Sequence, residues 1–349
     1  MEYRQLGRTG VRVSALCLGT MNLGGRAQRE TSAAIIEQAL DAGINFIDSA
    51  NVYGHAPDDF ETGRGRSEEI IGETLERLGV RSRVILATKT HFPMSDDPND
   101  QGNSRRNIIA SCEASLRRLR TDYIDLYQLH HPSNDVPIDE SLRALDDLVR
   151  DGKVRYIGGS AFAAWQHVEA LWAARELGLH RFIAEQPPYH LLDRRIEREL
   201  APMARSYGLA INPWSPTAGG FLTGRYRRGK SIPADSRFGV FWRGAVTGQF
   251  TERAFDVAEG VAALAAEKGC TPGQLALTWC MAQPGITSPL IGPRTVDQLE
   301  ESFGALDIEL TPEDRERLDR LAPPGRATVP YYGHDGFART TWGPHTQRW

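Results

Sequence analysis

The chain is 349 residues long, with 40% hydrophobic and 25% charged residues and a formal net charge of -4. These proportions are those of an ordinary globular protein and exclude the disordered and fibrous classes. So small a net charge argues against nucleic acid or an anionic membrane surface as the main partner. The N-terminus is polar, and no apolar run approaches the ~18 residues of a membrane span.

Four cysteines are scattered through the chain without a C-x-x-C pair or a metal-ligand spacing. They are Cys17, Cys112, Cys270 and Cys280. Each stands in an apolar or helical stretch, where a free cysteine behaves as a small hydrophobic residue. We therefore expect a reduced, cytoplasmic protein without a metal site.

Short apolar runs that predict β-strands alternate along the chain with amphipathic, helix-like stretches. Residues 3–6 and 11–13 flank a glycine-containing turn and predict a β-hairpin. The strands expected after it cover residues 15–18, 45–48, 84–88, 123–129, 154–158, 182–186, 210–214 and 289–292. Eight strands, each followed by helical sequence, predict an α/β protein whose parallel sheet closes into a (β/α)8 TIM barrel.

An open, doubly wound parallel sheet is the structural alternative. That fold requires G-x-G-x-x-G after its first strand, and residues 18–22 of this chain, LGTMN, do not supply it. We therefore expect one barrel domain over residues 1–349, with its core at about residues 15–321. A Gly- and Arg-rich loop (residues 217–248) follows the seventh strand, and an aromatic tail (residues 322–349) is expected over the barrel mouth.

Three ionisable residues, Asp48, Lys89 and His130, stand at the ends of three consecutive expected strands. Each is 41 residues from the next, which fits the length of one strand–helix unit. Residues at the carboxyl ends of neighbouring barrel strands converge on the face where barrel active sites lie. Tyr53 follows Asp48 in the adjoining loop. We therefore expect these four side chains, called here the strand-end tetrad, to meet.

Each member of the tetrad alone has an ordinary structural explanation, such as a helix cap, a packed ring or a solvated charge. Together they can protonate a carbonyl oxygen. A free tyrosine has a pKa near ~10, and the Lys89 ammonium is expected to lower the pKa of Tyr53. Asp48 would keep Lys89 charged in an apolar barrel mouth, and a neutral His130 would donate a hydrogen bond that orients the carbonyl. The sequence thus predicts Tyr53 as the catalytic acid.

The motifs that contain these residues resemble those of the aldo-keto reductases. They are Leu18-Gly19-Thr20-Met21, residues 43–54 (GINFIDSANVYG), Ala87-Thr88-Lys89 and Asp125-Leu126-Tyr127-Gln128-Leu129-His130. The likeness reaches about residue 321 and is strongest to the branch with bacterial reductases and potassium-channel β subunits, in which Trp214-Ser215-Pro216 and Gly224-Arg225-Tyr226 are typical. It implies reduction of a small-molecule aldehyde or ketone to an alcohol by NADPH, or the reverse reaction with NADP+, with Tyr53 as general acid or base.

The resemblance also implies where the cofactor binds, extended across the top of the barrel. The implied cofactor residues are Gly19, Thr20, Met21, Asp48, Ser160, Gln186, Trp214, Ser215, Pro216, Arg225, Gly292, Arg294, Gln298, Glu301 and Ser302. Ser160 and Gln186 would bond the nicotinamide carboxamide. Arg294 favours NADPH over NADH, because its guanidinium fork matches the oxygens of a 2′-phosphate. The implied substrate residues are Met21, Asn22, Tyr53, Phe92, His130 and Trp214.

Two positions depart from the family pattern. Ala161 stands where an Asn usually bonds the carboxamide, and Ser302 stands where an Asn usually contacts adenine. The loss of one hydrogen bond costs about 1 kcal/mol, so cofactor binding is expected to weaken rather than vanish. His130 is in place, which favours carbonyl chemistry over the reduction of steroid C=C bonds.

Two other functions stay open at this point. A keto- or enoyl-sugar nucleotide reductase would use arginines of residues 217–248 to meet a diphosphate. A cofactor-sensing partner subunit, like the channel β subunits, usually carries an N-terminal extension, and the start of this chain at the hairpin counts against it. The natural substrate, the reaction direction and the choice between monomer and homo-oligomer are left open.

Overall fold

The computed structural model describes residues 1–55, 62–241 and 250–329 and begins with the predicted hairpin. Strands β1 (Tyr3–Gln5) and β2 (Arg12–Ser14) pair antiparallel. Leu6 and Val13 are fully buried against side chains from inside the barrel. Gly7 has φ +58 and lies so close to Ile183 that a Cβ would come 2.6 Å from its carbonyl oxygen. The hairpin therefore covers the amino-terminal end of the barrel.

Eight parallel strands follow, in the spatial order β10-β3-β4-β5-β6-β7-β8-β9. They are β3 (Cys17–Gly19), β4 (Phe46–Asp48), β5 (Ile85–Thr90), β6 (Ile124–Leu129), β7 (Val154–Ser160), β8 (Phe182–Gln186), β9 (Ala210–Ile211) and β10 (Leu290–Ile291). Ile211 pairs with Ile286 in a parallel bridge, and the Leu290 N–H donates to the Pro213 carbonyl at 2.8 Å. These contacts join the two ends of the sheet, so the predicted (β/α)8 barrel is confirmed.

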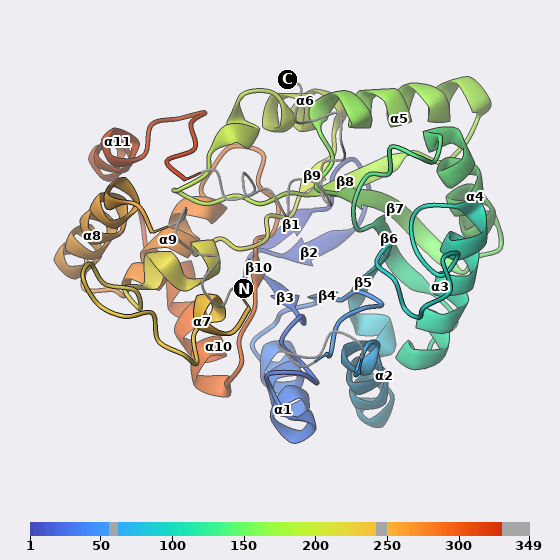
Figure 1. Cartoon of the computed structure of the whole chain (residues 1–349), viewed down its shortest axis with the longest axis horizontal. Helices are drawn as coiled ribbons and strands as arrows, with labels where there is room; N and C mark the ends of the chain where they lie inside the picture. The colour runs from blue at the N-terminus through green and yellow to red at the C-terminus, as the bar shows by residue number, and fades with distance from the viewer. Residues whose placement is uncertain (56–61, 242–249, 330–349) are drawn as a thin grey trace.

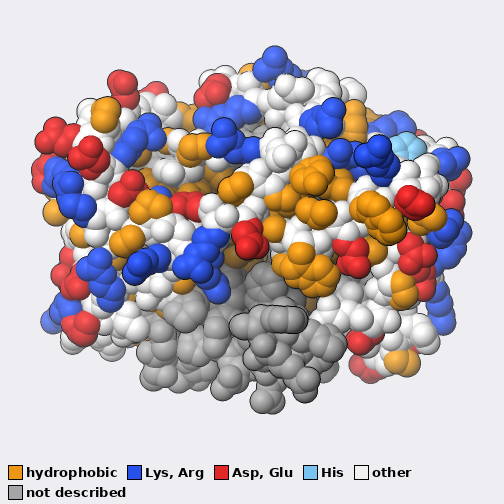
Figure 2. Space-filling view, turned by 90° about the horizontal axis from the view of Figure 1, so that it is seen from above, with side chains coloured by type: hydrophobic (Ala, Val, Ile, Leu, Met, Phe, Trp, Pro, Cys, Tyr) orange, Lys and Arg blue, Asp and Glu red, His pale blue; other side chains and the backbone are white. Residues whose placement is uncertain are grey.

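The helices surround the strands (Figure 1). They are α1 (Arg29–Asp41), α2 (Arg66–Leu78), α3 (Arg105–Leu119), α4 (Ile138–Arg150), α5 (Ala164–Leu177), α6 (Leu200–Tyr207), α7 (Arg237–Phe241), α8 (Glu252–Glu267), α9 (Pro272–Met281), α10 (Val296–Phe303) and α11 (Pro312–Leu321). Among the described residues, no helix is both long and apolar enough to cross a bilayer. The outer face of α5 exposes Trp165, Val168 and Trp172, and apolar side chains gather on the face of the molecule seen in Figure 2.

The last two barrel strands are shorter than the sequence predicts. Pro213 has no N–H to give to the ladder, so β9 ends at Ile211 and residues 210–214 do not form one strand. Trp214 still pairs with Pro188 in an isolated bridge. The chain therefore keeps its course beyond the strand end and carries Trp214 to the mouth of the barrel.

The loop after the seventh barrel strand and the tail are each described in part. The loop contains a 3-10 helix, Ala218–Thr223, and α7, while residues 242–249 lie outside the described residues. The start of the tail runs beside the segment after β8, where Thr328 N donates to Leu192 O at 2.9 Å. Residues 330–349, which include the tail aromatics, lie outside the described residues, so their place over the mouth stays a prediction.

Candidate active site

Inside the barrel, side chains change from an apolar to a polar layer along the strands. Residues of the apolar layer are followed two positions later by polar ones: Phe46 by Asp48, Ala87 by Lys89, Leu126 by Gln128 and Ala184 by Gln186. Alternate residues of a strand point to the same side, so both layers face the barrel interior. The polar layer lies at the carboxyl ends of the strands, the face on which barrel active sites are built.

Lys89 and Asp48 form a buried ion pair in this layer. The Lys89 ammonium donates to Asp48 Oδ2 at 2.5 Å and to the Ser49 carbonyl at 2.7 Å. The two side chains are 0% and 1% exposed. Burial alone would lower the pKa of Lys89, but the carboxylate of Asp48 and the hydroxyl of Tyr53 outweigh it and raise the pKa. Lys89 therefore stays an ammonium, as the sequence argument requires.

Tyr53 lies above this pair and beside His130. Its hydroxyl is 3.4 Å from His130 Nε2, and the Lys89 ammonium is 5.0 Å from the centre of its ring. Lys89 pulls the pKa of Tyr53 down, as expected, but desolvation of the hydroxyl is the larger effect and the pKa is raised. The expected net lowering is therefore wrong for the protein alone. The phenol is held in its protonated form.

His130 is held neutral in a cluster of rings. Burial and the Lys89 charge push the pKa of His130 well below its ordinary value. Burial and His91 lower the pKa of His131 to about 3. The Phe92 ring packs edge-on against both imidazoles, at 4.8 Å and 5.0 Å between ring centres. His130 Nε2 faces the Tyr53 hydroxyl, so it is the ring nitrogen placed to meet a substrate oxygen there.

The second oxygen of Asp48 is bound by two amides. Gln186 Nε2 donates to Asp48 Oδ1 at 2.8 Å, and Gln128 Nε2 does so at 3.3 Å. Ser160 donates its hydroxyl to the Gln186 carbonyl at 2.9 Å. The two residues implied for the carboxamide thus lie together and next to the tetrad. Gln128 was not predicted from the sequence as a site residue. Its position two residues after Leu126, on the same side of the strand, could have predicted it.

The loop after β3 reaches the loop after β10. The Thr20 hydroxyl donates a hydrogen bond to the Asp48 carbonyl at 2.9 Å and accepts a hydrogen bond from the Ser67 hydroxyl, also at 2.9 Å. Asn22 donates to the Gly292 carbonyl at 2.8 Å, and its own Oδ1 is buried without a partner among the described residues. Residues implied for the nicotinamide and for the phosphate therefore share one surface. Ser67 lies in α2 and was not predicted.

Four arginines, Arg26, Arg225, Arg237 and Arg294, form what we call the arginine cluster. Arg26 and Arg294 donate to the Asp235 carbonyl at 2.6 Å and 3.3 Å, and Arg225 pairs with the Asp235 carboxylate. Burial, with repulsion by Arg294 and Arg237, lowers the pKa of Arg26 to about 10. Arg237 also lies 3.8 Å from the Met21 sulfur. Sequence reasoning named two members and missed Arg26 and Arg237.

The residues implied for adenine lie on and around α10, where each has a bond within the protein. The Arg294 N–H donates to Gln298 Oε1 at 2.9 Å, and Thr271 donates to Glu301 Oε1 at 2.8 Å. The Ser302 hydroxyl donates to the Gln298 carbonyl at 2.8 Å. Ser302 is thus turned back onto its own helix. On the other side of the mouth, Ser215 has a φ of +55 between Trp214 and Pro216.

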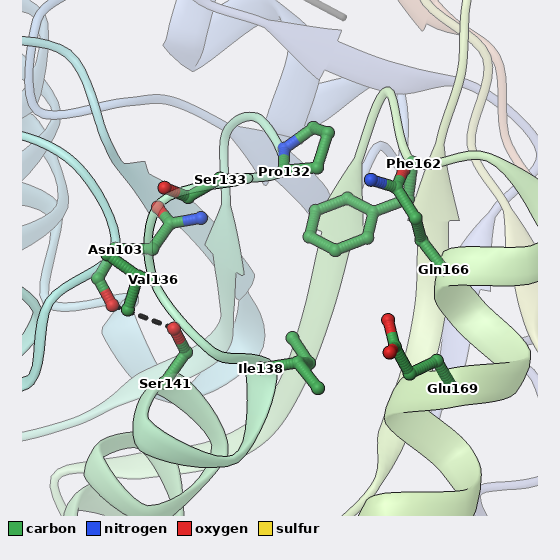
Figure 3. Close-up of a pocket in the computed structure, with 9 residues that line it drawn as sticks. All are labelled: Asn103, Pro132, Ser133, Val136, Ile138, Ser141, Phe162, Gln166 and Glu169. Atoms are coloured by element: carbon green, nitrogen blue, oxygen red, sulfur yellow. Dashed lines mark hydrogen bonds between the residues drawn. The ribbon is translucent and has the colours of Figure 1, made fainter. Parts of the chain in front are cut away.

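Figure 3 shows a separate small cavity of about 30 Å³ between the loop at residues 132–138 and α5. Pro132, Val136, Ile138 and Phe162 give it apolar walls, and Glu169 lies at its edge. No member of the tetrad lines it. It is therefore a neighbour of the candidate site, separated from Ser160 by the turn that carries Phe162.

Residues 15–323 match the model of the Aldo/keto reductase family. The chain belongs to that family. The chain is 41% identical over 339 residues to an uncharacterized oxidoreductase of Bacillus subtilis (strain 168), and the match covers 95% of this chain and 99% of the relative. It is 36% identical over 327 residues to a probable voltage-gated potassium channel subunit beta of Oryza sativa subsp. japonica, a match that covers 92% of this chain and 96% of the relative. It is 33% identical over 343 residues to versiconal hemiacetal acetate reductase of Aspergillus parasiticus, a match that covers 91% of this chain and 96% of the relative.

These similarities confirm the predicted family and branch. They make the aldo/keto reductase an oxidoreductase of a family whose general chemistry is carbonyl reduction. The structure brings Asp48, Tyr53, Lys89 and His130 together in this reductase. Their individual roles are a matter of mechanism.

Proposed function

We propose that this reductase transfers hydride from NADPH to the carbonyl carbon of a small aldehyde or ketone, with Tyr53 protonating the oxygen. The observation that carries the proposal is the buried chain of contacts from Asp48 through Lys89 to Tyr53 and His130. A carbonyl oxygen that accepts from both Tyr53 and His130 would be polarised and positioned at once.

The residues fit NADPH in the chemistry of their donors. The guanidiniums of the arginine cluster gather near Asp235, whose carboxylate pairs with Arg225 and whose carbonyl accepts from Arg26 and Arg294, and such a group of guanidiniums suits phosphate oxygens. Asn22 Oδ1 is a buried acceptor that awaits a donor, as the described residues give it none. When bound, NADPH supplies the hydride. Arg26 and Arg237 join Arg225 and Arg294 in holding its phosphates, with Arg294 at the 2′-phosphate.

The tetrad handles the proton. Tyr53 carries its hydroxyl proton at neutral pH and can give it to the substrate oxygen; burial raises its pKa and opposes this transfer, and the Lys89 charge favours it. The Lys89 ammonium then stabilises the phenolate left behind, and Asp48 keeps Lys89 charged. Neutral His130 donates from Nε2 to orient the carbonyl. In the reverse direction the Tyr53 phenolate accepts the proton of an alcohol.

The remaining implied residues complete the site. Ser160 and Gln186 bind the carboxamide, with Gly19, Thr20, Met21 and Trp214 around the nicotinamide ring. Ser215, Pro216 and Gly292 approach the phosphates, and Gln298, Glu301 and Ser302 approach adenine. Met21, Asn22, Phe92 and Trp214 form a mixed apolar and hydrogen-bonding substrate pocket.

The test is NADPH oxidation with an aromatic aldehyde such as 4-nitrobenzaldehyde, with wild type and Tyr53→Phe side by side. Turnover by the wild type that collapses in Tyr53→Phe, with NADPH binding retained, is the expected result. NADPH binding is followed in the same samples by quenching of tryptophan fluorescence. Absence of NADPH binding by the wild type would overturn the proposal.

A cofactor-sensing partner subunit is the second candidate, favoured by similarity to proteins named as potassium channel β subunits in Oryza sativa, Arabidopsis thaliana and Schizosaccharomyces pombe. It predicts tight NADPH binding without turnover of aldehydes, ketones or alcohols. The same pair of measurements therefore separates the two candidates.

A further inference from the structure

Strand β8 presents neighbouring side chains to opposite sides. Gln186 points into the barrel, where it binds Asp48 at 2.8 Å. Glu185, one residue earlier, points outward between the sheet and α5. There its Oε2 lies 2.7 Å from His167 Nε2, and both side chains are 0% exposed. This pair of titratable groups lies outside the tetrad and takes no part in the proton transfer.

Glu185 also reaches the turn that follows Ser160. The Phe162 N–H donates to Glu185 Oε1 at 3.2 Å, and the Ala161 N–H donates to the Gln186 carbonyl at 3.3 Å. The Ser160 hydroxyl donates to that same carbonyl at 2.9 Å. Two consecutive residues of β8 therefore hold three consecutive residues of the turn.

The turn needs such support because of its backbone conformation. Ala161 has a φ of +60, a left-handed conformation that costs an alanine free energy and is easier for Asn or Gly. Ala161 also has no side-chain amide with which to hold itself to β8 or to a ligand. The position of Ser160 is thus left to its neighbours.

Phe162 is buried, and Glu185 accepts its backbone N–H. Its ring lies 5.3 Å from the His167 ring on one side, and the cavity of Figure 3 lies on another. Gly159 leaves it the necessary room, because a Cβ there would come 2.9 Å from the ring and 3.4 Å from Glu185 Oε2. Without Glu185, the Phe162 N–H loses its acceptor, next to a small cavity that leaves the ring some freedom to shift.

We propose that Glu185 and His167 are a positioning pair for the nicotinamide end of the cofactor site. They hold the turn at residues 160–163, and so fix the Ser160 hydroxyl where the carboxamide binds. Neither residue touches the cofactor or the substrate. The proposal rests on the proposed function, in which Ser160 is a carboxamide ligand.

The experiment compares two ligands, NADPH and adenosine 2′,5′-bisphosphate, which carries the adenosine phosphates but no nicotinamide. Glu185→Ala is expected to bind NADPH about 10-fold more weakly and the bisphosphate as wild type does, since one positioning interaction is lost at one end of the site. Glu185→Gln keeps an acceptor for the Phe162 N–H and is expected to recover most of the NADPH affinity.

A matched control is Asp125→Ala. Asp125 accepts the Leu86 N–H at 2.9 Å and pairs with Arg81, so it too is a carboxylate that holds a neighbouring backbone, but at the start of β6. Its loss is expected to leave the ratio of the two affinities unchanged. Equal weakening of both ligands by Glu185→Ala, or unchanged NADPH binding, would overturn the proposal.

Two further measurements keep the test decisive. If Glu185→Ala does not fold, Gly159→Ala displaces the Phe162 ring without leaving a buried group unpaired, and the same selective loss of NADPH affinity is expected. If wild type binds neither ligand, the proposed function fails on its own. Hydrogen exchange at residues 160–163 then tests the pair directly: faster exchange in Glu185→Ala than in Asp125→Ala supports it, and equal exchange overturns it.

Discussion

The strand-end tetrad and the arginine cluster are two charged regions of one barrel mouth, built in opposite ways. In the tetrad, Lys89 and Asp48 are buried and satisfied by each other, with Gln186 completing the carboxylate. In the arginine cluster, Arg26, Arg225 and Arg294 bind Asp235, whose side chain is 74% exposed. The tetrad is complete by itself. The cluster is more open to solvent, with the Arg225 side chain 33% exposed.

The difference lies in what positions each region. Tetrad members stand on or beside strands, and the register of the sheet sets their relative heights, with Lys89 opposite Gln128. Cluster members come from loops and from α7, in three separate parts of the chain. A rigid, desolvated group suits proton transfer, whereas a partly hydrated basic group suits an anion that comes and goes.

Removing the proton donor should abolish proton transfer by the tetrad and leave cofactor binding by the arginine cluster intact. Tyr53→Phe is expected to lower aldehyde turnover about 10³-fold, because the substrate oxygen loses its acid, and to leave NADPH affinity unchanged. Steady-state rates with fluorescence titration measure both. Tyr3→Phe is the control: it removes a hydroxyl that binds the Gly43 carbonyl at 2.9 Å in the hairpin, away from the mouth. A large loss of NADPH affinity in Tyr53→Phe would contradict the separation.

Breaking the buried pair should damage stability as well as turnover. Lys89→Met leaves the Asp48 carboxylate buried without its cation, and such a loss costs about 3–5 kcal/mol of unfolding free energy. The double variant Asp48→Asn/Lys89→Met should recover much of the stability and none of the activity. Lys153→Met, at a surface pair with Glu113, should cost under about 1 kcal/mol in urea unfolding. Similar losses at the two lysines would refute the contrast.

The sequence predicts the tetrad because strand ends are visible in it. Three ionisable residues at steps of 41 residues need only the barrel to be brought together. It does not predict Arg26 or Arg237, because loop conformations place them and arginine is common throughout this chain. The net shift in the pKa of Tyr53 was missed for a related reason, since desolvation of a hydroxyl depends on three-dimensional packing. Pro213, which ends β9 early, was a readable signal that was not used.

Weakening the arginine cluster should change cofactor choice and depend on salt. Arg294→Ala is expected to lower the preference for NADPH over NADH about 10- to 100-fold, because the 2′-phosphate loses a bidentate partner. The loss should shrink at high ionic strength, since a partly exposed cluster is screened. Fluorescence titrations with both cofactors at low and high salt measure it. Arg228→Ala is the control, because Arg228 pairs with Glu252, Asp256 and Glu259. An unchanged preference in Arg294→Ala would assign the 2′-phosphate elsewhere.

The neutral histidines beside the tetrad should make the fold sensitive to acid. The pKa of His130 and of His91 is lowered in the folded state, and that of His131 falls to about 3. Between the ordinary value near 6.5 and these lowered values, the unfolded chain binds more protons, so stability falls as pH falls.

His131→Gln removes one of these groups from the proton balance. Between pH 7 and pH 5, the free energy of unfolding of this variant should decrease by about 1–2 kcal/mol less than that of wild type, as measured by denaturant titrations. His180→Gln, at a half-exposed imidazole paired with Asp146, is the comparison variant. A pH slope of His131→Gln equal to that of wild type would mean that His131 is protonated in the folded protein.

The smallest effect is expected at Ala161, where the site departs from the family pattern. Ala161→Asn places a residue that tolerates φ near +60 and adds an amide beside the proposed carboxamide site, so stability should rise by about 0.5–1 kcal/mol and NADPH affinity a few-fold. Ala161→Gly separates the two gains, because glycine relieves the backbone without adding an amide. Ser302→Asn is the counterpart at the adenosine end. Adenosine 2′,5′-bisphosphate should respond to Ser302→Asn and not to Ala161→Asn, and a response to both would show that the two ends are coupled.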